Sequence, residues 1–510
     1  MARAEGDEVP PVPIGMYVDG VPYLKRGHFV ALWVYNLLTG VRHVIVVFLK
    51  KTLCQCGCRA WCTLWHVFTC FAWALSAAPV GIFPDTWENL EAWPESEERR
   101  RNLGGTRMRY KFCLMWNKCD WAETATTCGF QTWAHKAFPC NQCWCEKSEM
   151  CVVGAEYEEG LPWALVSEAD YDLACSSCEQ TVVIRDRATL SRVRAALRFG
   201  RRKKGSKALP VMKGRGLRVD VKVGDQTLKA GDRLEPSKHT LDTHTFGLGT
   251  LVFPIIGIFW RIRNETFATH RNPLFTIPGF SVNRFVPDIL HCVYLGVAQS
   301  WLGAAIWSLF KSDVWKLGSD QLNVMKFRSL LFTYYKKLKR PGITRVQMVT
   351  LSMLGPRSKA APQPFKGAEA KHLIPFVVGL LQEHCGGGPQ FLLQAGLNLV
   401  RWIELIDSQP LHMTTEAKVE LRKVTVRFLF LGIRGGMRAI AKTHQMLHLV
   451  WDCLEAHGNP RFYSDFLDES LNQDLAAVAA RAYSSVWHAR ILICWRSICK
   501  SRPHGILIGE

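Results

Sequence analysis

The chain has 510 residues, of which 48% are apolar and 21% are charged. This length and composition allow a substantial core and two or three domains, and they exclude a mainly disordered protein. The 64 lysines and arginines exceed the 44 aspartates and glutamates and leave a net charge of +20. Such an excess favours a polyanionic partner, either nucleic acid or an anionic membrane surface.

The N-terminal residues 1–13 are acidic and proline-rich and contain no apolar core, so they predict neither a secretory signal nor a transit peptide. We therefore expect a cytosolic or nuclear protein. The longest apolar stretch runs from Cys292 to Phe310 and contains the polar residues Gln299, Ser300 and Ser308. These residues favour a buried helix over a membrane span, and we expect no membrane partner.

Cysteines are concentrated in the first part of the chain, where 14 of the 19 lie at or before Cys178. Without an export signal, clustered thiols are more often metal ligands or core residues than disulfides. Two groups are candidates for a second zinc site, alone or together: Cys54, Cys56, Cys58 and Cys62, and the pair Cys175 and Cys178. Close spacing of the first group strains a tetrahedral geometry, so ordinary unpaired thiols are the alternative.

Three strands are predicted near the N-terminus by segments rich in Val, Ile, Tyr, Trp and Phe. They are Ile14 to Leu24, His28 to Leu37 and Val41 to Lys50, with a turn at Asn36 to Gly40 between the last two. We expect consecutive antiparallel pairing.

A helix is predicted from Trp61 to Ala78, where apolar residues recur at helical spacing and Pro79 follows. A buried strand from Tyr110 to Asn117 comes next, with Asp120 just beyond its end. With Asp19 on the first strand, the order strand, strand, strand, helix, strand is that of the ribonuclease-H-like fold, which is an analogy of fold only.

The rest of the chain predicts an α/β (α+β) protein whose core is interrupted by a large, mainly helical insertion. Residues after Asn283 show helical periodicity to about Leu454, and the region before them indicates a partly β subdomain. The expected parts are the first half of a ribonuclease-H-like core at 14–139, a Cys-rich and basic subdomain at 140–283, a helical insertion at 284–454 and the C-terminal part of the core at 455–510.

Three carboxylates are candidates for a catalytic metal site: Asp19, Asp120 and Glu469. Phosphodiester cleavage is assisted by two divalent ions about 4 Å apart, and Mg²⁺ (or Mn²⁺) prefers carboxylate oxygens. Each acid also has a structural interpretation, as a turn residue, a helix cap or a favourable charge at a helix N-terminus. Asp465 and Asp468 compete with Glu469 for the third position.

A structural zinc site is predicted by Cys140 and Cys143, spaced i and i+3, with His444 and His448, spaced i and i+4 on one helical face. These four side chains provide the ligands of a tetrahedral zinc. Zinc would pin the entry of the insertion to its exit, and we expect it to assemble the core without taking part in the chemistry. The alternative is two helical histidines facing solvent or core beside unpaired thiols.

A basic run at Arg201, Arg202, Lys203 and Lys204 is the best candidate for DNA contact. Such residues provide salt-dependent binding to phosphates with little reading of bases. The run also resembles a nuclear localisation signal, so we expect the nucleus, against the alternative of a solvated basic loop.

Several short motifs together resemble plant-type CACTA (En/Spm) transposases. They are Asp120-Trp-Ala-Glu123, Pro139 with its Cys-x-x-Cys pair, Pro287-Asp288-Ile-Leu-His291 with Leu295-Gly-Val297 after it, and Lys442-Thr-His444 with His448. The cysteine pair, later histidine pair and final glutamate also resemble the catalytic core of the V(D)J recombinase, in which a zinc-binding insertion splits a ribonuclease-H-like fold. Asp288 and His291 match the family's Asp-x-x-His element, whose role is not assigned, and Asp288 is also a natural N-cap.

The resemblance implies a DDE transposase that cleaves DNA at transposon ends and transfers the freed 3′ hydroxyl to target DNA. It also implies a homo-oligomer that pairs two DNA ends. Because only 18 residues precede Asp19, we expect the ends to be recognised by a separate DNA-binding subunit or by the insertion. The alternative function is a catalytically inactive, zinc-stabilised DNA-binding protein derived from a transposase.

Overall fold

The computed structural model describes most of residues 11–176 and 272–495 and, between these ranges, only short strands. Shorter segments outside the described part are residues 25–26, 54–60, 88–90, 128–129, 131–132, 136, 339–342, 355–364, 385–388, 483–486 and 488–489. The chain divides into two compact units, which are considered separately. The first contains Met1–His135, Val166–Phe285 and Asn472–Glu510, and the second contains Lys136–Leu165 and Val286–Leu471.

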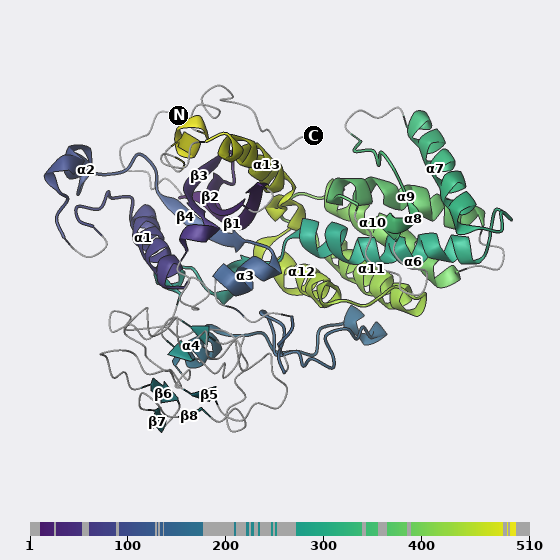
Figure 1. The fold of residues 1–510 in the computed structure, drawn as a ribbon, viewed down its shortest axis with the longest axis horizontal. Helices are drawn as coiled ribbons and strands as arrows, with labels where there is room; N and C mark the ends of the chain where they lie inside the picture. The colour runs from purple at the N-terminus through teal and green to yellow at the C-terminus, as the bar shows by residue number, and fades with distance from the viewer. Residues whose placement is uncertain are drawn as a thin grey trace. The chain divides into compact units, whose positions relative to one another are not determined.

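The first unit is built on a mixed five-stranded sheet with the order β11-β4-β1-β2-β3 (Figure 1). Strands β1 (Val12–Leu24), β2 (Gly27–Asn36) and β3 (Arg42–Leu49) are antiparallel neighbours. Strand β4 (Phe112–Lys118) runs parallel to β1, and the short β11 (Phe285–Val286) lies beside β4. The predicted strands and their antiparallel order are confirmed.

The turn between β2 and β3 shows why the meander forms where the sequence predicts it. Asn36 accepts a hydrogen bond from the backbone of Leu38 through Oδ1 at 2.8 Å, which is an Asx turn. Gly40 has φ of +69°, a conformation that glycine adopts at little cost. The two residues reverse the chain and set the register of the strands that follow.

One face of the sheet is covered by aromatic residues from the C-terminal part of the first unit. Trp33 of β2 packs edge-on against Trp495 with ring centroids 4.9 Å apart. Phe29 packs against Trp487 at 5.5 Å in a similar arrangement. Such pairs add stability beyond the area they bury, and they fasten the end of the chain to the first strands.

Helix α1 (Trp61–Val80) contacts β4 and runs two residues further than predicted. Pro79 does not stop the helix, because a proline this close to the end disturbs little of the hydrogen-bond ladder. The helix ends instead at Gly81, whose φ is +77° and whose N–H bonds the carbonyl of Ala77 at 3.0 Å.

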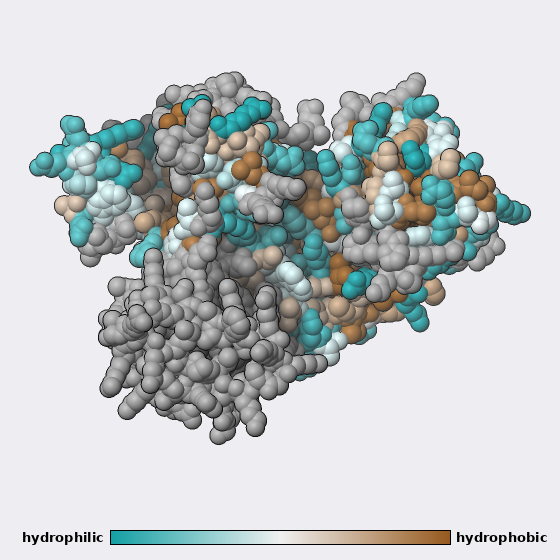
Figure 2. Space-filling model, in the orientation of Figure 1, coloured by the Kyte–Doolittle hydropathy of each residue, from teal (hydrophilic) through white to brown (hydrophobic). Residues whose placement is uncertain are grey.

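Shorter helices complete the part of the first unit that the structure describes: η1 (Lys50–Thr52), η2 (Glu95–Glu97), α2 (Glu98–Leu103), α3 (Trp121–Thr127), α4 (Glu168–Ser176), η5 (Pro273–Thr276) and η6 (Val282–Arg284). Small strands are β5 (Leu209–Pro210), β6 (Val221–Val223), β7 (Gln226–Leu228), β8 (Arg233–Leu234), β9 (Phe246–Gly247) and β10 (Thr250–Leu251). Helix α2 buries none of its residues, and Figure 2 shows hydrophilic side chains over it.

The second unit is helical, as predicted. It contains η3 (Ala155–Glu158), the π-helix η7 (Leu290–Val297), α6 (Ala298–Lys311), α7 (Asp320–Lys337), α8 (Leu351–Leu354), α9 (Gly367–Glu383), α10 (Gln390–Ser408), α11 (Thr415–Arg434), α12 (Ala441–His457) and η8 (Pro460–Tyr463). Helix α10 packs along α11, and η7 and α6 pack on α9. Helix α13 (Phe466–Ala480) begins in this unit and ends in the first.

Two described helices are long and apolar enough to cross a membrane, at Thr63–Val80 and Leu290–Lys311. The second is 89% buried inside the protein, which agrees with the buried helix predicted for that stretch. The predicted α/β class with a large helical part is confirmed.

Candidate metal centre and carboxylate sites

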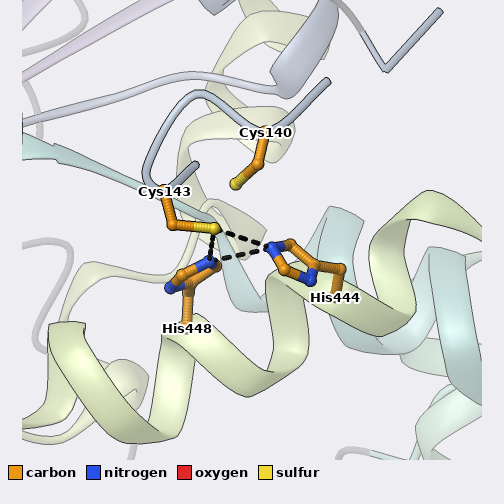
Figure 3. A group of neighbouring side chains, drawn as sticks. All are labelled: Cys140, Cys143, His444 and His448. Carbon is orange, nitrogen blue, oxygen red and sulfur yellow. Dashed lines mark hydrogen bonds between the residues drawn. The ribbon is translucent and has the colours of Figure 1, made fainter. Parts of the chain in front are cut away.

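Four side chains of the second unit converge from two distant segments (Figure 3). Cys140 and Cys143 lie on a loop, and His444 and His448 lie one turn apart on α12. Their ligand atoms all lie within 4.8 Å of one another, and each side chain is at most 1% exposed. The structure therefore brings together all four residues that the sequence predicts as zinc ligands.

The spacing of these atoms is close to that of a tetrahedral zinc site. Nε2 of His448 lies 3.0 Å from Nε2 of His444, and each nitrogen lies 3.2 Å from Sγ of Cys143. Zinc bond lengths of about 2.0 Å to nitrogen and about 2.3 Å to sulfur place two tetrahedral nitrogen ligands about 3.3 Å apart, and a nitrogen and a sulfur ligand about 3.5 Å apart. A shift of a few tenths of an ångström thus accommodates the ion.

Groups around the cluster orient its ligands. Nδ1 of His448 lies 2.5 Å from Oδ2 of Asp452, which leaves Nε2 facing the thiols. The backbone N–H of Gln142 donates to Sγ of Cys140 at 3.3 Å. The ring of Trp163 packs on His444 with centroids 4.6 Å apart. A carboxylate behind a ligating histidine and an N–H on a ligating sulfur are usual around bound metals.

Electrostatics favour an ionised thiol in this cluster. Burial opposes ionisation of Cys140, but hydrogen bonds from Cys143 and His444 and the charge of His448 lower its pKa well below the usual range. Burial also opposes the charged form of His448, yet the charge of Cys140 and the bond to Asp452 raise its pKa to about 10. The cluster therefore holds a thiolate at Cys140 and a proton on His448, and a bound cation would displace that proton.

These four residues form a closed, buried Cys/His cluster that could hold a metal such as zinc. Because all four positions of a tetrahedron are filled by protein and shielded from solvent, the site is of the structural kind. It would join residues 137–165 to α12 within the second unit.

Asp19 and Asp120 lie close together in the first unit because of strand register. β1 and β4 pair in parallel, with Tyr17 opposite Lys118. Asp120 lies two residues beyond this pair, just past the end of β4, and Asp19 lies two residues beyond it within β1, where it pairs with Ala31 of β2. Adjacent strands are about 4.8 Å apart. Both side chains are partly exposed.

Each of the two aspartates also accepts backbone hydrogen bonds. Oδ1 of Asp19 accepts from the N–H of Gly20 at 2.6 Å, and Oδ1 of Asp120 accepts from the N–H of Glu123 at 2.6 Å. The second bond is an N-cap of α3, as the structural interpretation of Asp120 predicts.

Three further charged groups lie in this part of the first unit. Nζ of Lys50 is 3.9 Å from Oε2 of Glu123, which is buried. A Cβ at Gly20 would lie 2.2 Å from Nζ of Lys50 and 3.4 Å from Oε2 of Glu123, so the glycine leaves room for both. Lys118 is also fully buried, with Nζ 4.6 Å from the ring centroid of Tyr35. The sequence alone did not single out Lys50 or Lys118, whereas Glu123 ends the Asp120-Trp-Ala-Glu123 motif.

A second candidate cluster lies in the second unit at the start of η7. Asp288, His291 and Asp465 have ligand atoms within 4.8 Å of one another. Oδ2 of Asp288 accepts from the backbone N–H of His291 at 2.7 Å and lies 2.8 Å from its Nδ1, so the N-cap interpretation of Asp288 is confirmed. Oδ1 of Asp288 accepts from the N–H of Asp465 at 2.8 Å.

His291 connects this cluster to the third predicted acid. Its Nε2 lies 3.5 Å from Oε1 of Glu469, whose side chain is 33% exposed. Burial opposes protonation of His291, but the hydrogen bond and charge of Asp288 raise its pKa to about 10. Asp465 and Asp468, the competitors of Glu469, are both fully buried. Without a metal, this cluster holds a protonated histidine between carboxylates.

Some predicted residues lie outside the described part of the chain: Arg201, Arg202, Lys203, Lys204, Cys54, Cys56, Cys58 and Cys178. The side chains of Cys62 and Cys175 are likewise not described. DNA contact by the basic run and a second zinc site remain predictions.

No family model matches this chain, and no curated protein matches it in sequence. Function is therefore inferred from the chain's own residues.

Sequence reasoning missed residues that support the ligands. Asp452 follows His448 by four residues on α12, and this spacing is a signal that could have been used. Cys145 follows Cys143 by two residues, and a hydrogen bond with Cys143 lowers its pKa to about 6. Asn472, a hydrogen-bond partner of Asp19, carries no comparable signal.

Proposed function

We propose that this chain is the catalytic core of a DNA transposase, which cleaves DNA strands and transfers them in a metal-dependent reaction. The observation that carries the proposal is the parallel register of β1 and β4, in which Asp19 within β1 and Asp120 just past the end of β4 each follow the pair Tyr17 and Lys118 by two residues. The order of strands β3, β2, β1 and β4, with the helix α1 before β4, supports a ribonuclease-H-like core. That fold carries catalytic acids at these two places, by analogy.

The acids suit hard divalent cations. Asp19, Asp120 and Glu469 are the proposed ligands of Mg²⁺ or Mn²⁺, which take carboxylate oxygens. A pair of such ions would activate the attacking water or 3′ hydroxyl and stabilise the leaving oxygen. The chain's own part is to hold the carboxylates in place, and the partial exposure of all three is compatible with access of a phosphodiester. Glu469 is assigned from the order of acids along the sequence.

The Cys/His cluster has a structural role in this proposal. Zinc on Cys140, Cys143, His444 and His448 would hold the second unit's N-terminal loop on α12. Because α12 is followed closely by α13, the helix that begins near Glu469, the cluster would stabilise the segment that leads to the third acid.

The proposed partners are DNA, both transposon ends and target, and further copies of the chain. A net charge of +20 supports a polyanionic partner. The basic run at Arg201–Lys204 is proposed to contact phosphates and to direct the protein to the nucleus.

A nicking assay tests the proposal. Zinc-loaded full-length protein is incubated with supercoiled plasmid in Mg²⁺ or Mn²⁺, and open-circular product is measured. Asp19→Asn and Asp120→Asn should each abolish metal-dependent nicking and leave plasmid binding unchanged. Asp474→Asn removes an exposed carboxylate from α13 and serves as the control. Nicking that survives in both active-site variants would refute the proposed site.

A catalytically inactive, zinc-stabilised DNA-binding protein is the second candidate. It is favoured by the hydrogen bonds that already occupy the acids: Asp120 caps α3, and Asp19 accepts from Gly20. If the wild-type protein binds DNA but does not nick plasmid in either metal, this second function replaces the first.

A further inference from the structure

Asn472 is a buried amide that contacts one of the proposed catalytic acids within the first unit. It lies on α13, is 2% exposed, and donates from Nδ2 to Oδ2 of Asp19 at 2.9 Å. The same Nδ2 is 3.3 Å from the hydroxyl of Tyr17, two residues earlier on β1. The two residues are 453 positions apart in sequence, so the contact is formed only by the fold.

The orientation of this amide is determined by Trp33. The indole Nε1–H donates to Oδ1 of Asn472 at 3.1 Å, and an indole nitrogen can only donate. Oδ1 must therefore face Trp33, and Nδ2 must face Asp19. Trp33 is fully buried on β2 opposite Tyr17, so its ring cannot move without disturbing the sheet.

The two carboxylate oxygens of Asp19 are thus held from two sides. Oδ1 accepts from the backbone N–H of Gly20 at 2.6 Å, and Oδ2 accepts from Asn472. Together these donors fix the plane of the carboxylate relative to β1. A carboxylate oxygen has further lone pairs after accepting one hydrogen bond, so a cation can still be bound.

Asp19 does not need this hydrogen bond in order to be tolerated in the fold, because its side chain is partly exposed and water can solvate it. A buried polar group such as Asn472 is costly unless its donors are used. An apolar residue of similar size would leave the buried indole N–H of Trp33 without its acceptor, so Oδ1 of the amide serves the packing of Trp33. The donor side of the amide is explained if orientation of Asp19 is its function.

We infer that Asn472 is a positioning residue that orients Asp19 for a divalent cation, with Trp33 fixing the direction of the amide. The inference rests on the proposed function of Asp19 as a metal ligand. Residues that orient a ligand in this way commonly change metal affinity or activity by about 10–100-fold when they are replaced.

The test measures Mn²⁺ binding to zinc-loaded full-length protein by the loss of the free-ion electron paramagnetic resonance signal. Asn472→Ala should raise the Mn²⁺ concentration for half saturation about 10–100-fold. Trp33→Phe keeps a buried ring but removes the N–H, so the amide can turn, and a smaller increase is expected. The Mg²⁺ concentration that gives half-maximal nicking should rise in the same order.

A matched control separates orientation from loss of a buried amide. Asn459 is fully buried; its Nδ2 donates to the backbone carbonyls of Ile406 and Gln409, and its Oδ1 accepts from the backbone N–H of Arg461. Asn459→Ala should lower the thermal unfolding temperature and leave Mn²⁺ binding unchanged. Equal Mn²⁺ binding by Asn472→Ala and Asn459→Ala would overturn the inference.

Asp19→Asn separates this inference from the proposed function. If Asp19→Asn does not weaken Mn²⁺ binding, Asp19 is not a ligand and the inference fails. If Asp19→Asn and Asn472→Ala both weaken Mn²⁺ binding while the wild type nicks no DNA, the positioning role stands and the transposase activity does not.

Discussion

Oδ2 of Asp452 lies 2.5 Å from Nδ1 of His448, one turn further along α12. This contact fixes the ring so that Nε2 faces the cysteine thiols, and a carboxylate in this place makes the imidazole a better ligand. Asp452→Asn should therefore weaken zinc binding about 10–100-fold. Competition with a chromophoric zinc chelator measures the affinity.

The control for this change is Glu455→Gln on the same helix. Glu455 pairs with Lys418 at 2.7 Å and does not contact the cluster ligands. Its loss should leave zinc affinity at the wild-type value. If Asp452→Asn binds zinc as tightly as Glu455→Gln, the orienting role of Asp452 is wrong.

Removal of zinc should destabilise the second unit. Folded protein that binds zinc at 100 times its dissociation constant gains about 2.7 kcal/mol relative to metal-free protein. Cys143→Ser should lose one zinc per chain, measured by atomic emission. The variant should also unfold at a lower temperature than the wild type, and adding a chelator should no longer change that temperature. Cys151→Ser alters an exposed thiol and provides the control. If a chelator does not change the unfolding temperature of the wild type, the proposal of a structural zinc is contradicted.

The sequence predicts those parts of the protein whose physical signal is local. Segments rich in Val, Ile, Tyr, Trp and Phe predict β1 to β3, and ligand types at fixed spacing predict the cysteine and histidine pairs. The end of α1 is predicted less well, because Gly81 and not Pro79 terminates it. Asn472 could not be predicted, since its partners Trp33 and Asp19 are 439 and 453 residues away.

The third acid can be identified by comparing Glu469 with its buried neighbours. Glu469 is 33% exposed, so Glu469→Gln should abolish nicking with little change in stability. Asp468 is fully buried, and Asp468→Asn should lower the free energy of unfolding by about 1–3 kcal/mol while nicking is retained. Nicking and urea unfolding are measured on each variant. Loss of nicking in Asp465→Asn but not in Glu469→Gln would make Asp465 the third acid.

Asp288 should contribute to stability through both its cap and its ion pair. Asp288→Ala removes the acceptor for the His291 backbone and leaves a partly buried histidine without this carboxylate. Because the His291 side chain is 23% exposed, the loss should be smaller than the about 3–5 kcal/mol of a fully buried pair. Asp288→Asn keeps a side-chain oxygen that can accept the capping hydrogen bond, so its free energy of unfolding should fall less than that of Asp288→Ala. Urea unfolding gives both values, and a wild-type midpoint for Asp288→Ala would contradict this account.

The Glu455 pair should make stability depend on pH in the acid range. Hydrogen bonds from Lys418 and Arg422 lower the pKa of Glu455 in the folded protein. Because this pKa is lower in the folded than in the unfolded protein, the ionised carboxylate stabilises the fold at every pH above the unfolded pKa near 4.5. The stabilisation is lost as the pH falls through the folded pKa. Glu455 is 50% exposed, so Glu455→Gln should cost less than about 1 kcal/mol at pH 7. Urea unfolding of the wild type and of Glu455→Gln, at pH 7 and below pH 4, measures the difference in their free energies of unfolding. This difference should disappear in acid. A difference that grows in acid would show that the pKa shift has the opposite sign.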